Sequence, residues 1–142
     1  MDEILKRLEL LHPKIIDLKL DRVKRLLRKL GNHEKSIPPV IHVAGTNGKG
    51  STIAMIKSGL QRSGFRTHTY TSPHLVSFNE RIEIGDKRIS DDALKEVLNE
   101  CEKVNNSQPI TFFEITTCAA FLAFSRASAD YTPVSYTHLT LP

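Results

Sequence analysis

A strand-like run that turns through glycines into a helix is the feature that most constrains the fold of this chain. The run V-I-H-V-A at 40–44 is followed by G-T-N-G-K-G-S-T at 45–52 and then by a helical pattern. β-Branched residues favour a strand, and glycines let the backbone curve around an anion. The first N–H groups of a helix have no partner within the helix and attract phosphate. The stretch therefore predicts an α/β fold with a nucleotide phosphate site.

The spacing of this loop departs from the common pattern G-x-x-x-x-G-K-[ST]. Val43 stands at the first glycine position, and Gly50 stands where a hydroxyl residue usually follows the lysine. Lys49 adds a full positive charge on a flexible stem. A plain glycine-rich turn is the alternative. We expect the phosphates to be bound by Thr46, Asn47, Gly48, Lys49, Gly50, Ser51 and Thr52.

The composition of the 142 residues is that of an ordinary chain with one modest domain. The net charge of +4 arises within residues 1–35, where ten Lys and Arg face six Asp and Glu. These charges alternate with apolar positions at helical spacing, which favours a solvated helix face over a nucleic-acid surface. No apolar run approaches the roughly 18 residues of a membrane span. Cys101 and Cys118 lack metal-type spacing and indicate buried thiols in a reducing, cytoplasmic compartment.

Apolar periodicity predicts the remaining elements. The expected helices cover 2–11, 19–30, 50–63, 90–104 and 111–127, and the expected strands cover 40–44 and 66–71, with a hairpin at 82–89. Two strands that flank one helix form a βαβ unit, so we expect a partial, mainly parallel sheet with flanking helices. In the helix at 50–63 we expect Ile53, Met55, Ile56 and Leu60 to face inward.

Three further segments carry candidate ligand contacts. T-S-P-H-L-V at 71–76 follows the second strand, and loops at the carboxyl ends of strands border the ligand crevice of such sheets. T-F-F-E at 111–114 matches a capping box, in which Thr111 and Glu114 satisfy each other's backbone donors. Asp17 lies in a short apolar link, where it is either a substrate contact or a helix-terminal charge.

Together, A-G-T-N-G-K-G-S-T, T-S-P-H-L-V and T-F-F-E resemble the Mur ligase superfamily, and its folylpolyglutamate and dihydrofolate synthase branch in particular, from about residue 11 to 132. The resemblance implies an enzyme of folate biosynthesis and one-carbon metabolism, monomeric at full length. With ATP and Mg²⁺, such a ligase joins L-glutamate to folate or dihydropteroate through an acyl phosphate.

The resemblance also implies roles for single residues. Lys49 is the expected catalytic residue and Ser72 the expected magnesium ligand, with a plain turn at Ser72-Pro73 as the alternative. Phe112 and Phe113 suit the flat pterin ring, or they belong to the core. The implied substrate-binding residues are Asp17, Ser72, Pro73, His74, Thr111, Phe112, Phe113 and Glu114.

The end of the chain departs from the family. V-S-Y-T-H-L-T-L-P at 134–142 resembles a translated sequencing adapter, so residues 133–142 are expected to be a foreign tail, with a genuine polar terminus as the alternative. Residues 129–132 look like the approach to a third sheet strand, but Pro133 argues against that strand continuing, because proline cannot donate to a ladder. Residues 1–132 are then an incomplete N-terminal part of the ATP-binding domain, without the glutamate-binding domain. We expect this chain alone to be inactive.

Two rival functions stay open from the sequence. One is a non-catalytic nucleotide-binding fragment. The other is a different Mur-type ligase, of the peptidoglycan or cyanophycin kind. Nucleic acid and membranes are not expected partners, since the basic helices lack interleaved aromatic residues.

Overall fold

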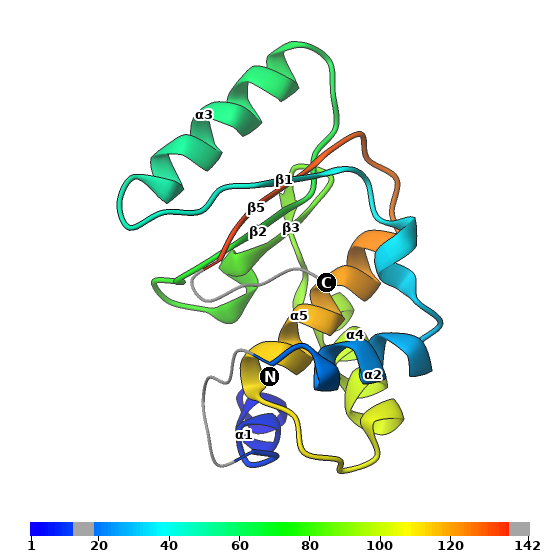
Figure 1. Ribbon diagram of the computed structural model, residues 1–142. Coiled ribbons are helices and arrows are strands. Elements are labelled where there is room, and N and C mark those ends of the chain that lie inside the picture. Colours follow the sequence, from blue (N-terminus) through cyan, green and yellow to red (C-terminus); the bar gives the residue numbers. More distant parts are fainter. Residues whose placement is uncertain (13–18, 137–142) are drawn as a thin grey trace. The chain divides into compact units, whose positions relative to one another are not determined.

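The computed structural model describes residues 1–12 and 19–136, and it divides into two compact units (Figure 1). Unit 1 contains the described residues of Met1–Ser36 together with Asp91–Ala123. Unit 2 contains Ile37–Ser90 and the described part of Phe124–Leu139. Asp17 lies outside the described residues, so its predicted substrate contact stays a prediction.

Unit 1 is helical. Its elements are α1 (Asp2–Glu9), α2 (Asp21–Lys29), the 3₁₀ turn η1 (His33–Ser36), α4 (Asp91–Asn105) and most of α5 (Phe112–Ser125). Each helix turns its apolar stripe inward, as the periodicity predicts. The core contains fully buried side chains from all four helices, among them Leu8, Leu26, Leu27, Leu94, Leu98 and Ile115.

Unit 2 is built on a five-stranded sheet in the order β1-β5-β2-β3-β4 (Figure 1). The strands are β1 (Val40–His42), β2 (Thr69–Thr71), β3 (Ile82–Ile84), β4 (Lys87–Arg88) and β5 (Thr132–Ser135). β1, β5 and β2 run parallel, whereas β3 and β4 form the predicted antiparallel hairpin. Helix α3 (Lys49–Arg62) connects β1 to β2, and the 3₁₀ turn η2 (Phe78–Arg81) precedes β3. The α/β class expected from the sequence is confirmed.

The strand β5 contradicts the prediction that the strand approached at 129–132 does not continue through Pro133. β5 contains this proline, lies between β1 and β2, and pairs with both. The two strands of the predicted βαβ unit are therefore not neighbours. The pairing of residues so distant in sequence leaves no local pattern from which it could be predicted.

The sheet tolerates Pro133 because an N–H at this position would point towards β2, where the pairing of the two strands is interrupted. The N–H of Thr132 and the C=O of Val134 both form hydrogen bonds on the β1 side, at 2.8 Å each. Since backbone groups alternate in direction along a strand, Pro133 faces β2. At that level the pairing with β2 is interrupted, between the isolated bridge Thr67↔Tyr131 and the continuous register that includes Val134. The proline therefore removes one ladder bond without ending the strand.

Of the four residues of α3 expected to face inward, only Ile53 is buried, Ile56 and Leu60 are intermediate, and the prediction for Met55 is wrong. The side chain of Met55 is 74% exposed, whereas that of Ile53 is 4% exposed. Successive helical residues are separated by about 100°, so positions two apart point to nearly opposite faces.

Within residues 1–12 and 19–136, no helix combines the length and apolarity that a bilayer crossing requires.

Candidate nucleotide site

The loop between β1 and α3 is shaped by two glycines. Gly45 has φ +145° and Gly48 has φ +72°, conformations that favour glycine. A Cβ built at either position meets no atom within 4 Å, so both backbones border open space. The first bond of α3 runs from Thr52 N to Gly48 O, at 2.9 Å. The N–H groups of residues 49–51 precede it and have no partner within the helix, which suits an anion.

Lys49 folds back over this loop. Its Nζ donates to Gly45 O at 2.6 Å, and the side chain stays partly exposed. An ammonium carries three N–H donors, of which this contact uses one. The Thr52 hydroxyl makes a similar local contact, because Oγ1 donates to Gly48 O at 2.8 Å. The loop thus holds one cation beside its open amides.

A cavity of about 630 Å³ opens beside the loop within unit 2. Its wall combines the loop, one face of α3, strands β2 and β3, and the segment that follows β2. Of the described residues predicted to bind ligand in this unit, Ser51, Thr52 and His74 are not on the wall. Those that share the wall are Thr46, Asn47, Gly48, Lys49, Gly50, Ser72 and Pro73.

The cavity wall also carries an ion pair that the sequence reasoning missed. Lys57 of α3 and Glu83 of β3 approach to 2.5 Å between Nζ and Oε2, with about a quarter of each side chain exposed. Lys57 follows Lys49 by eight residues, which is close to two helical turns and places both lysines on one helix face. The spacing of the two lysines along the helix could therefore have revealed Lys57 from the sequence. No pattern in the sequence points to its partner Glu83 on β3. The pair gives the cavity a second cation, neutralised locally by Glu83.

The segment that carries Ser72 is tied to its surroundings by Glu80 and Arg81, which sequence reasoning also missed. Ser77 and Glu80 form a capping box at the start of η2. The pattern S-x-x-E at 77–80 was the signal that could have revealed it. Arg81 Nε donates to His74 Nδ1 at 2.6 Å. Burial, followed by the positive charge of Arg81, lowers the pKa of His74 below its ordinary value.

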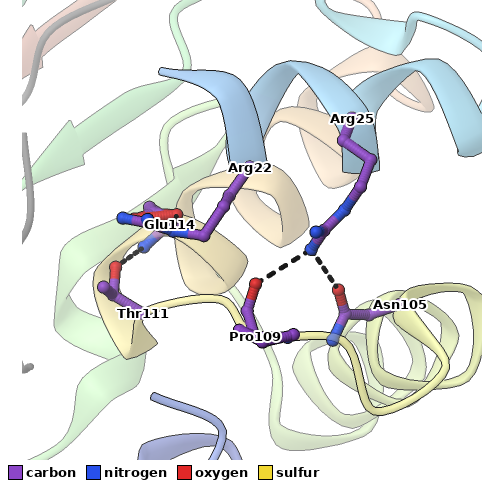
Figure 2. Close-up of polar contacts among 6 residues, drawn as sticks. All are labelled: Arg22, Arg25, Asn105, Pro109, Thr111 and Glu114. Carbon is purple, nitrogen blue, oxygen red and sulfur yellow. Dashed lines mark hydrogen bonds and ion pairs between the residues drawn. The ribbon is translucent and has the colours of Figure 1, made fainter. Parts of the chain in front are cut away.

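The T-F-F-E segment begins helix α5 in unit 1, as Figure 2 shows. The Glu114 N–H donates to Thr111 Oγ1 at 3.2 Å, which confirms one half of the predicted capping box. The other half is wrong. The Glu114 carboxylate, only 2% exposed, accepts three hydrogen bonds from Arg22. Nε donates to both carboxylate oxygens, at 2.9 and 3.1 Å, and Nη2 donates to Oε1 at 2.6 Å. Burial favours this bidentate partner over a backbone N–H, because a buried carboxylate requires a countercharge.

A second arginine of α2 holds the loop before this segment. Arg25 Nη2 donates to Pro109 O at 3.0 Å and to Asn105 Oδ1 at 3.3 Å (Figure 2). Phe112 and Phe113 are each half-buried. The first turn of α5 is therefore fixed by α2, with the two aromatic rings partly accessible.

This chain is similar in sequence to known proteins that share one name. The chain is 44% identical over 113 residues to a Bacillus subtilis dihydrofolate synthase/folylpolyglutamate synthase, covering 75% of this chain and 26% of that protein. It is 38% identical over 126 residues to the Escherichia coli protein of the same description, covering 89% and 30% respectively. No family model matches the chain.

Solved structures agree with these sequences. An Escherichia coli FolC structure in complex with DHPP and ADP superimposes with a TM-score of 0.86 at 36% identity, covering 94% of this chain and 32% of that one. A Yersinia pestis bifunctional folylpolyglutamate synthase/dihydrofolate synthase, complexed with AMPPNP and Mn, gives a TM-score of 0.84 at 33% identity, covering 94% and 32%. The chain therefore spans about a quarter to a third of the length of these relatives.

Proposed function

We propose, on the premise that this chain belongs to the folylpolyglutamate and dihydrofolate synthase family, that unit 2 binds the phosphates of ATP for an amide ligase. The ligase joins L-glutamate to folate or dihydropteroate. The observation that carries the proposal is the common cavity wall formed by the Lys49 loop and Ser72. A nucleotide held by the loop and an acceptor held by the Ser72 segment meet in such a cavity.

The loop suits a nucleotide phosphate in shape and charge. Open space borders Gly45 and Gly48, so phosphate oxygens can approach the backbone closely. The amides of the first turn of α3 and the Lys49 ammonium provide donors and positive charge. The first turn of α3 contains no acidic residue to oppose that charge.

A magnesium ion fits beside Ser72 only with help from the nucleotide. The Ser72 hydroxyl is a hard but neutral oxygen donor, and Mg²⁺ is commonly held by few protein ligands together with phosphate oxygens and water. The described residues contain no group of three or more His, Cys, Asp and Glu side chains able to hold a metal. On the resemblance, Ser72 is the candidate ligand that this chain contributes.

The residues of this chain position reactants and neutralise charge. When bound, ATP supplies the phosphoryl group that activates a carboxylate, and Mg²⁺ neutralises phosphate charge. Lys49 orients the terminal phosphates and offsets negative charge that accumulates on them during transfer. The amides of residues 49–51 hold the same oxygens in place, which lowers the entropic cost of alignment.

For the acceptor we propose contacts from Pro73 and His74 in unit 2. The T-F-F-E segment of unit 1 is a separate candidate contact, proposed on the resemblance alone. The half-buried rings of Phe112 and Phe113 provide apolar faces for a flat ring. The Glu114 carboxylate is already engaged by Arg22, which favours the rings over this carboxylate as the contacting groups. Asp17 stays a proposed contact on the resemblance alone.

Substitution of Lys49 tests the nucleotide site. Lys49→Ala removes a charge beside the loop, and we expect at least tenfold weaker binding of ATP, about 1.4 kcal/mol. Isothermal titration with ATP and Mg²⁺ measures the change. Lys87→Ala, on the exposed strand β4, is the matched control and should bind like the unmodified chain. Equal affinity for ATP in the Lys49→Ala and Lys87→Ala variants would reject the assignment.

Ligand choice tests the ligase class. We expect binding of dihydropteroate and no binding of a UDP-muramyl peptide, which a peptidoglycan ligase would prefer. The glycine loop and Lys49 account for nucleotide binding by themselves, so nucleotide binding without turnover is a second candidate function. Glutamate-dependent release of ADP by the chain as given would exclude that candidate.

A cytoplasmic location, a monomeric state and a foreign origin of residues 133–142 stay proposals.

A further inference from the structure

The segment between β2 and η2 holds a defined conformation although its tip is not buried. It contributes Ser72, Pro73 and Leu75 to the cavity wall. The side chains of Leu75 and Val76 are 92% and 90% exposed. Apolar burial therefore does not hold these two residues in place, and polar contacts must do so.

Glu80 provides those contacts through three consecutive backbone amides. Its Oε2 accepts from Leu75 N at 3.0 Å, and its Oε1 accepts from Val76 N and from Ser77 N, at 2.8 Å each. Hydrogen bonds to an ionised acceptor are stronger than those between neutral groups. The three bonds favour the charged carboxylate and lower the pKa of Glu80 to about 2.

The turn that carries Glu80 is itself attached to the core of unit 2. Phe78 is 4% exposed, and buried Asn79 donates through Nδ2 to Ile89 O at 3.0 Å. The guanidinium of Arg81 lies 5.1 Å from the ring centroid of Phe78 and reaches His74. The cavity wall is thus connected to the core of unit 2. The connection runs through the turn η2, the Glu80 carboxylate and the loop amides that this carboxylate binds.

We propose that Glu80 is a positioning residue that holds the Ser72–Leu75 segment on the cavity wall before any ligand binds. The inference rests on the proposed function in one respect, the identity of the ligand that this segment binds. That ligand is an acceptor with a flat heteroaromatic ring. A segment already ordered loses less conformational freedom on binding, which strengthens affinity. Both carboxylate oxygens of Glu80 accept hydrogen bonds from loop amides, so Glu80 acts on the ligand through the loop.

Amide hydrogen exchange tests the ordering directly and needs no ligand. In the unmodified chain, the amides of Leu75, Val76 and Ser77 should be protected despite their exposed location. Glu80→Gln should raise their exchange about tenfold, because the amide side chain is a weaker acceptor with one oxygen. Glu83→Gln is the matched control, since Glu83 pairs with Lys57. Unprotected amides in the unmodified chain, or equal exchange in both variants, would overturn the proposal.

Ligand affinities test the consequence for binding. Glu80→Gln should weaken dihydropteroate binding about fivefold and leave ATP binding within about twofold, whereas Glu80→Asp should recover part of the loss. Unchanged dihydropteroate affinity would contradict a positioning role. A parallel loss of metal-dependent ATP binding would instead make Glu80 a metal ligand and overturn the inference.

The two proposals fail in different ways. If the unmodified chain binds no dihydropteroate, the proposed function fails, and hydrogen exchange still decides whether Glu80 orders the segment. If Glu80→Gln does not fold, protection in the unmodified chain and in Glu80→Asp decides the same question.

Discussion

Two regions of this chain carry the same local pattern and use it differently. S-x-x-E at 77–80 begins η2 in unit 2, and T-x-x-E at 111–114 begins α5 in unit 1. The partly exposed Glu80 bonds amides only three to five residues away. The buried Glu114 reaches Arg22, 92 residues away in sequence. The pattern marks the start of a helical turn in both regions, while burial decides the partner of the carboxylate.

The largest expected effect comes from the buried pair. Arg22→Leu leaves the Glu114 carboxylate, 2% exposed, without its countercharge. We expect a loss of about 3–5 kcal/mol in the free energy of unfolding, measured by urea denaturation with circular dichroism. The double variant Arg22→Leu/Glu114→Leu should recover much of it. If the double variant is as unstable as the single one, uncompensated charge is not the cause.

A smaller effect is expected at the two capping hydroxyls. Thr111→Ala removes a fully buried acceptor from the Glu114 N–H and should lower the free energy of unfolding by about 1 kcal/mol. Ser77→Ala should change local amide exchange around η2 more than global stability, because Glu80 still holds the preceding amides. Urea midpoints and hydrogen exchange separate these outcomes. A larger global loss for Ser77→Ala would reverse the comparison.

The smallest expected effect is a pH dependence of the stability that the partly exposed Glu80 carboxylate contributes. Its pKa falls from 4.5 to about 2 on folding, so between these values the unfolded chain binds more protons than the folded chain. The contribution of Glu80 is therefore present above about pH 4.5 and is lost as the pH falls toward 2. The difference in amide protection between the unmodified chain and Glu80→Gln should narrow across this window. A difference that stays constant down to about pH 2 would contradict it.

Elements specified by neighbouring residues were predictable from sequence. The run at 40–52 predicted β1, its glycine loop and α3, and Gly85-Asp86 predicted the turn of the β3–β4 hairpin. What failed depends on residues far apart in the chain. Nothing near Pro133 reveals that its strand lies between β1 and β2 with a gap opposite the proline.

The candidate site divides in the same way. The loop residues around Lys49 were read from local spacing, and they share a cavity wall with Ser72. The partners Lys57–Glu83 and Arg22–Glu114 were missed, because a charged side chain does not specify which distant element it meets. His74 was named as a ligand contact, and its hydrogen bond with Arg81 became visible only in three dimensions.

The central position of β5 has a consequence for biosynthesis. β2 ends at Thr71 and β5 begins at Thr132, about sixty residues later. At translation rates of roughly 5–20 residues per second, β1 and β2 emerge from the ribosome about 3–12 seconds before the strand that joins them. During that interval both strands expose unpaired edges. Until β5 is inserted, the unpaired edges of β1 and β2 are therefore open to pairing with other chains.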